Sequence, residues 1–317
     1  MSLPSQLIQL IQQQSRQPVS PEFSQLSQAL LERFGSATQA ILFYGSCLRS
    51  GNHLDGLIDL YVVVNDYHKA YGKRTLSLCN QLLPPNVFYL EVSSANRVIR
   101  AKYAVISLQD LQRGTSMTWF HSYLWGRFAQ PMRVLYAQGE TLRQQIDAAL
   151  AQAVVTFMTR VLPSLPARFE VRELWLTGLL LSYQAELRAE KSTRVSQLWD
   201  AAQPYYEQIT QVAMPALPYA VYTDGSSQPL CYVAQITATT RLINQLTWRV
   251  RQIQGKLLSL ARLSKALLTF QGGVDYIVWK LERHSGTAIP VPPRLRRYPL
   301  LFGWGLLWRL YRRGVFR

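Results

Sequence analysis

Residues 42–46 read LFYGS, and residues 57–64 read LIDLYVVV. Both segments are rich in β-branched and aromatic side chains, which favours two strands. The first segment ends in Gly45-Ser46, and Asp59 lies near the start of the second, thirteen residues after the serine. The pattern predicts a strand, a turn into a short helix, and a second strand that begins with a carboxylate.

Such an arrangement resembles the polymerase β-like nucleotidyltransferase fold. Gly45 would let the backbone approach a triphosphate closely, and Ser46 would donate a hydrogen bond to a phosphate oxygen at the start of a helix. Asp59 would bind Mg²⁺, which bridges phosphate oxygens in phosphoryl-transfer sites. We therefore predict a metal and triphosphate site at this turn.

The residues leave the second metal ligand open between alternatives. The generic fold has two carboxylates one residue apart, but the residue two positions before Asp59 is Leu57. Either Asp59 suffices, or another carboxylate converges on it from a neighbouring segment. The candidates for this role are Asp55, Asp66 and Glu91.

The remaining patterns predict an α+β chain in three parts. These are a nucleotidyltransferase domain (1–138), a helical domain (139–230) and a basic amphipathic C-terminal region (231–317). In the first part we expect a helix at 21–34 and strands at 40–44, 58–64, 86–92 and 102–107. In the second part we expect helices at 142–161, 171–190 and 196–211, punctuated by prolines.

Positive charge is concentrated in the C-terminal region. Residues 1–240 contain 19 basic and 16 acidic side chains, and residues 241–317 contain 15 and 2, which together give 34 − 18 = +16. From Leu242 to Leu260, apolar residues recur every three or four positions among basic ones. This pattern indicates a basic amphipathic helix for a polyanion, either an anionic membrane surface or nucleic acid.

A short apolar run from Tyr298 to Trp308 is followed at once by arginines. As a helix it would span about 18 Å, too short to cross the ~30 Å hydrocarbon core of a bilayer. Leucine and glycine fill the gaps between its aromatic residues, which favours a membrane interface over base stacking. We expect a peripheral membrane protein and no nucleic-acid partner; the alternative is a helix that packs on the body or on a partner.

Composition excludes several other classes. With 48% hydrophobic residues the chain can form a core, and three cysteines are too few for a disulfide scaffold. The N-terminus lacks the basic start and apolar stretch of a secretory signal, and no uninterrupted apolar run is long enough to span a membrane.

Several motifs together make a resemblance specific. Tyr44-Gly45-Ser46 with residues 57–60 (LIDL) resembles the mitochondrial-type phosphatidate cytidylyltransferase family, the translocator assembly and maintenance proteins. That family also has one carboxylate in this strand. Further similar stretches are 102–107 (KYAVIS), 123–131 (YLWGRFAQP), 165–169 (LPARF), 181–188 (LSYQAELR) and the basic stretch 265–281. Cys47 replaces a family glycine after the serine.

The resemblance implies synthesis of CDP-diacylglycerol from CTP and phosphatidate, with Mg²⁺ and release of pyrophosphate. A bacterial member would act on the cytoplasmic face of the inner membrane. Tyr44, Gly45 and Ser46 would bind the nucleotide, and Asp59 the metal. Alternatives are another nucleotidyltransferase acting on RNA or protein, and a membrane-bound scaffold that has lost its metal.

Two basic residues are further candidates. Lys102, at the start of a strand, would contact a phosphate of CTP or phosphatidate, although a solvated lysine at a strand end is the alternative. Arg127 would clamp a phosphate with its two-pronged guanidinium, unless it forms a structural ion pair. Glu186 and Arg188 are two positions apart and cannot pair on one helix face, so each needs a partner elsewhere.

Overall fold

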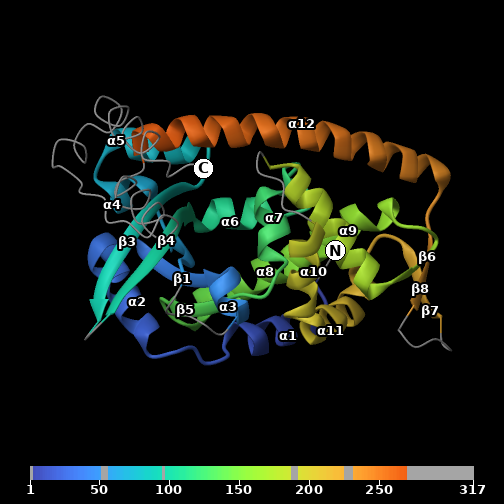
Figure 1. The fold of residues 1–317 in the computed structure, drawn as a ribbon, viewed down its shortest axis with the longest axis horizontal. Helices are drawn as coiled ribbons and strands as arrows, with labels where there is room; N and C mark the ends of the chain where they lie inside the picture. The colour runs from blue at the N-terminus through green and yellow to red at the C-terminus, as the bar shows by residue number, and fades with distance from the viewer. Residues whose placement is uncertain (1–2, 51–55, 95–96, 187–191, 225–230, 270–317) are drawn as a thin grey trace, which may run out of the picture.

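The computed structural model describes residues 3–50, 56–94, 97–186, 192–224 and 231–269. Asp55, a candidate metal ligand, and the apolar run 298–308 lie outside these ranges. The described chain combines two sheets with helices, as the α+β prediction requires (Figure 1).

The larger sheet has five strands in the order β3-β4-β2-β1-β5. Only β2 and β4 run parallel, and the other neighbours are antiparallel. The four predicted strands are confirmed: β2 has the predicted bounds and the other three are longer than predicted, whereas the edge strand β5 was not predicted. The bounds are β1 Thr38–Tyr44, β2 Ile58–Val64, β3 Asn86–Ser94, β4 Arg97–Ser107 and β5 Arg133–Ala137.

Alternation along β2 determines which face of the sheet carries the site. Ile58, Leu60, Val62 and Val64 pack into one buried cluster with α2 (Glu22–Phe34) and α4 (Tyr67–Tyr71). Tyr61 and Val63 pack into the other cluster, which includes α6 (Leu108–Thr115), α7 (Ser122–Phe128) and α8 (Glu140–Val161). Because neighbouring strand residues face opposite sides, Asp59 is on the α7 and α8 side.

The second part of the chain is less purely helical than predicted. Short strands β6 (Arg168–Glu170), β8 (Cys231–Gln235) and β7 (Ala220–Asp224) form a three-stranded sheet in that order. The predicted helix 196–211 is also wrong: α10 (Ser192–Asp200) ends before α11 (Gln203–Ala213), whose first turn contains Pro204. Proline lacks the N–H that a continuous helix needs and is tolerated in a first turn.

Other helices frame these elements. α9 (Val171–Gln184) is shorter than the predicted 171–190. Of the remaining elements, α3 is a five-residue helix after the Gly45 turn, α1 packs mainly on α8 and α11, and α5 packs mainly on α4. Their bounds are α1 Ser5–Ser15, α3 Ser46–Ser50, α5 Arg74–Leu82, η1 Gly35–Ala37, η2 Leu162–Ser164 and η3 Met214–Ala216.

One helical stretch in the described residues, Glu140–Ser164, is long and apolar enough to cross a membrane by length and composition. However, 83% of its apolar window is buried inside the protein. Its side chains belong to the cluster that also contains residues of α1, β2 and α9. This is the position of a core helix.

The predicted basic amphipathic helix is present as α12 (Ala238–Thr269), which extends along the top of the view in Figure 1 from β8 to α5. The three-part division at residues 138 and 230 stays a prediction. One hydrophobic cluster includes residues from both sides of 138, and β7 and β8 pair across 230.

Candidate active site

The turn after β1 brings the predicted glycine against the predicted aspartate. Gly45 has φ +94°, a backbone conformation that residues with a Cβ rarely adopt. A Cβ added there would lie 2.6 Å from Oδ2 of Asp59. In the β1–β2 register, Asp59 pairs with Tyr44. The absence of a side chain at position 45 therefore lets the carboxylate lie directly against the turn.

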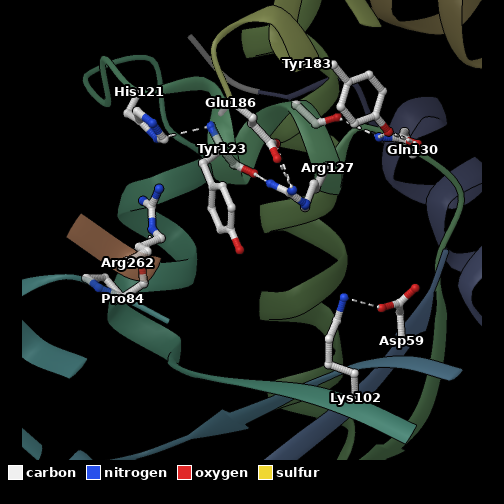
Figure 2. Close-up of polar contacts among 11 residues, drawn as sticks. Asp59, Pro84, Lys102, His121, Tyr123, Arg127, Gln130, Tyr183, Glu186 and Arg262 are labelled. Atoms are coloured by element: carbon white, nitrogen blue, oxygen red, sulfur yellow. Dashed lines mark hydrogen bonds and ion pairs between the residues drawn. The ribbon is translucent and has the colours of Figure 1, made fainter. Parts of the chain in front are cut away.

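Lys102 provides the nearest cation to this carboxylate. It is opposite Asp59 in the parallel β2–β4 register, and its Nζ lies 2.9 Å from Asp59 Oδ1. The side chains are 36% and 20% exposed respectively. A ligand can therefore reach both, and Figure 2 shows the pair at one side of the site.

Tyr44 and Ser46 differ in exposure. Tyr44 packs its ring 5.1 Å from that of Tyr61. Burial and then the negative charge of Asp59 raise the pKa of Tyr44, whereas Arg127 lowers it. The residue thus stays a neutral phenol within electrostatic range of both groups. Ser46 is exposed at the start of α3 and available to a ligand.

Arg127 has a carboxylate partner 59 positions away. Its Nη2 donates to Glu186 Oε2 at 2.7 Å, and its Nη1 donates to the Tyr123 carbonyl at 3.0 Å. Burial lowers the pKa of Arg127, but Glu186 and the nearby tyrosines more than offset that effect, so the net shift is upward. The structure thus supplies the partner that Glu186 required and joins two of the family-like motifs, 123–131 and 181–188.

A second arginine, which the sequence analysis did not single out for the site, stacks on the same tyrosine. The Arg262 guanidinium lies 4.1 Å from the Tyr123 ring centroid, and that of Arg127 lies 3.9 Å from it. Figure 2 shows the ring between the two arginines. Nothing local in the sequence signals this contact, because Arg262 comes from α12.

His121 is buried beside these cations and remains neutral. Its Nδ1 accepts a hydrogen bond from the backbone N–H of Tyr123 at 3.2 Å, which caps α7. Burial and then the charges of Arg262, Arg127 and Arg251 lower its pKa to about 3. The imidazole therefore adds no positive charge near neutral pH.

Glu91 is not brought to Asp59. It lies on β3, pairs with Arg100 through a 3.0 Å ion pair and accepts a hydrogen bond from Tyr89 at 2.6 Å. Asp66 caps α4, where it accepts from the Lys69 N–H. Asp55 lies outside the described ranges. Among the described residues, Asp59 is therefore the candidate carboxylate that lies at the Gly45 turn.

The donor set fits a metal that arrives together with phosphates. Within the described residues, no group of three His, Cys, Asp or Glu side chains is placed to hold a metal ion. Mg²⁺, however, is usually held by one or two carboxylates and completes its shell with water and substrate phosphates. Asp59, partly exposed and pressed against a side-chain-free turn, meets that requirement.

Comparison with known proteins identifies the family. The family model described as "Phosphatidate cytidylyltransferase, mitochondrial" matches residues 58–246, more than half of the chain. The match includes Asp59, Lys102, Arg127 and Glu186; Gly45 precedes it and Arg262 follows it. No curated protein matches.

Among solved structures, a nucleotidyltransferase-like protein from Exiguobacterium sibiricum is similar over 92% of each chain at 10% identity, with a TM-score of 0.27. A score this low adds nothing to the fold assignment. The sheet, its carboxylate and the family match define a nucleotidyltransferase. The chain belongs to the mitochondrial phosphatidate cytidylyltransferase family and is an enzyme of that class.

Proposed function

We propose that the protein transfers the cytidylyl group of CTP to phosphatidate, forming CDP-diacylglycerol and pyrophosphate. Within the family, one observation carries this proposal: Asp59 lies against the Gly45 turn, with Lys102 Nζ 2.9 Å away. That arrangement provides a carboxylate, a cation and an accessible backbone turn for a triphosphate and its metal.

The reaction needs positioning more than acid–base catalysis. A phosphate oxygen of phosphatidate attacks the α-phosphorus of CTP, the bond from that phosphorus to its bridging oxygen breaks, and pyrophosphate leaves with the electron pair. A phosphomonoester has its second pKa near ~6, so the attacking group is largely a dianion at neutral pH. Binding and charge neutralisation therefore provide most of the catalysis.

The chain's residues have separate tasks in this scheme. Asp59 would hold Mg²⁺, which supplies neutralisation of charge on the triphosphate and on departing pyrophosphate. Gly45 admits the triphosphate to the backbone turn, and the exposed Ser46 donates to a phosphate oxygen. Lys102 keeps a cation beside the same phosphates.

The acceptor is a lipid, and α12 offers a surface for a bilayer. Its outward face exposes large apolar side chains, each 51–64% exposed, a continuous patch of a kind that normally marks an interaction site. Arg249 and Lys256 are exposed on the same helix. The apolar residues are Leu242, Ile243, Leu246, Val250, Ile253, Leu257, Leu260 and Leu263.

We propose that this apolar face of α12 lies on an anionic membrane surface and makes the enzyme a peripheral protein. By the same proposal it acts on the cytoplasmic face of the inner membrane. Apolar burial and the two exposed cations both favour such binding. Of the other basic residues in the predicted pattern, Arg251 is buried, and Arg262 and Lys265 are half-buried against the body.

Labelled CTP tests the reaction. With Mg²⁺ and phosphatidate vesicles, label on the α-phosphate should enter the lipid fraction, and label on the γ-phosphate should leave as pyrophosphate. Diacylglycerol vesicles, which lack the attacking phosphate, are the matched control and should yield no labelled lipid. Labelled oligonucleotide or protein without labelled lipid would overturn the proposed substrate.

Vesicle sedimentation tests the membrane surface. Replacing Leu246, Ile253 and Leu257 together by serine should reduce sedimentation with anionic vesicles at least about 10-fold, because burial of each leucine-sized side chain contributes about 1.5–3 kcal/mol. The control replaces exposed Gln245 and Gln254 by serine on the same helix. Unchanged sedimentation, with a smaller oligomer instead, would assign the apolar face to a second copy of the chain.

A further inference from the structure

The inward face of α12 carries cations into the protein. Arg251 is fully buried and donates to the Phe120 carbonyl at 2.8 Å. Lys265 donates to the carbonyls of Leu83 and Pro85. Arg262 lies between these two along the helix and is the one that reaches the Tyr123 ring beside Arg127.

Arg262 is held in place but not neutralised within the described chain. Its Nε donates to the Pro84 carbonyl at 3.3 Å, and its planar group stacks on Tyr123. Its Nη1 is buried without a hydrogen-bond partner among the described residues, and no described carboxylate pairs with it. Burial lowers the pKa of Arg262; Tyr123 opposes that shift, Arg127 adds to it, and Tyr61 and Glu186 oppose it to a smaller extent.

The local charges do not balance. Lys102 is paired with Asp59, and Arg127 with Glu186. Arg262 and the buried Arg251, whose charge also lowers the pKa of His121, add two further cations to two described carboxylates. His121, with its lowered pKa, stays uncharged at neutral pH. A buried, unpaired charge is unfavourable unless a ligand pairs with it. An anion is therefore the ligand that this cluster favours.

We propose that Arg262 binds a phosphate group of a substrate, in an anion site that it shares with Arg127 across the Tyr123 ring. This inference rests on the proposed function for the identity of that substrate. A guanidinium presents several N–H donors in a plane and matches phosphate oxygens well. The phosphate belongs either to the triphosphate of CTP or to the phosphomonoester of phosphatidate.

Arg262 lies on the same helix, α12, as the exposed apolar face. The outward face of this helix is the exposed apolar face, and its inward face supplies the anion-binding cation. Gly255 lies within the same helix, and a Cβ there would collide with the Ala185 carbonyl oxygen, one residue before Glu186. Close packing of α12 thus fixes Arg262 relative to the Arg127–Glu186 pair.

Two measurements on the full chain test the proposal. Calorimetric titration with inorganic phosphate and with pyrophosphate should show at least about a 10-fold loss of affinity in Arg262→Gln, the range for losing a hydrogen bond to a charged group. Arg172→Gln, an exposed arginine on α9, is the matched control and should bind both anions as the wild type does. Arg262→Lys keeps the charge without the planar fork, so its anion affinity should lie between those of the wild type and Arg262→Gln. It serves as the test if Arg262→Gln does not fold.

Kinetics then identify the source of the phosphate. A KM raised about 10-fold for CTP alone, with weaker pyrophosphate binding, assigns Arg262 to the triphosphate. The same rise for phosphatidate alone, with weaker phosphate binding, assigns it to the acceptor. Anion affinities and both KM values within twofold of wild type in a folded variant would overturn the proposal. The anion titrations decide this even if the wild type does not convert phosphatidate.

Discussion

At the scale of single residues, Gly45 is the position where the backbone conformation and the neighbouring Asp59 both require glycine. Its positive φ would strain any residue with a Cβ, and the side chain would also meet Asp59. Gly35 has a positive φ of +53° with nothing within 4 Å of an added Cβ. Substituting each glycine in turn therefore distinguishes the effect of backbone strain from the effect of a collision with Asp59.

We expect Gly45→Ala to abolish most turnover, because the methyl group displaces the Asp59 carboxylate. Both Gly45→Ala and Gly35→Ala should lower the free energy of unfolding by about 1–2 kcal/mol through backbone strain. Steady-state kinetics and urea unfolding of both variants make the comparison. Equal turnover in the two alanine variants would contradict the proposed contact.

The buried His121 predicts a pH dependence of stability. The folded state keeps it neutral down to about pH 3, whereas the unfolded chain protonates near the ordinary value of 6.5, so the unfolded state binds more protons between these limits. The free energy of unfolding should fall as the pH drops below 6.5, by up to about 1.4 kcal/mol per unit from this residue.

His121→Asn retains a side-chain acceptor for the cap and removes the titration. Between pH 6.5 and 5 the wild type should lose about 1.6 kcal/mol more unfolding free energy than the variant. Urea unfolding at the two pH values measures this difference. Parallel losses would show that the imidazole is not held neutral.

At the scale of elements, the strands and the turn between them were predictable because their signals are local. Residues 58–64 alternate between two buried faces, and Gly45-Ser46 punctuates the end of β1. The strands of the second sheet are three to five residues long, too short for a clear alternation. The pairing of Arg127 with Glu186 and the contact of Arg262 with Tyr123 could not be predicted either, since the partners lie far apart in the sequence.

The helix α12 shows why periodicity alone was insufficient. Its spacing correctly predicted an amphipathic helix, but such a pattern does not say which face meets the body. Here the apolar face is outside, and Trp248, Gly255 and several basic side chains are inside. Tertiary contacts, such as those with Phe120, Tyr123 and Pro84, establish that orientation.

Gly255→Ala should shift α12 away from Ala185, because the added methyl group meets a backbone carbonyl that cannot rotate aside. We expect a loss of about 1–3 kcal/mol in unfolding free energy and weaker anion binding, as in Arg262→Gln. Gln254→Ala changes the neighbouring exposed residue and should leave both properties unchanged. Wild-type stability and anion affinity in Gly255→Ala would contradict the close packing.

At the scale of the whole molecule, α12 connects parts that are distant in sequence. It contacts η2 near its start, α7 in the middle, and α5 and β3 toward its end. The site thereby draws on the Gly45 turn, on β2 and β4, on α7, on Glu186 just after the end of α9, and on α12. The net charge of +16 indicated an anionic partner in general. The fold indicates where on the protein an anionic partner would bind.

The most direct measurement concerns Asp59. With α-labelled CTP, Mg²⁺ and phosphatidate vesicles, Asp59→Asn should form labelled CDP-diacylglycerol at least about 100-fold more slowly than wild type. It should retain wild-type unfolding free energy to within about 1 kcal/mol and sediment with the vesicles equally well. Wild-type turnover in this variant would show that the carboxylate against the Gly45 turn does not carry the reaction.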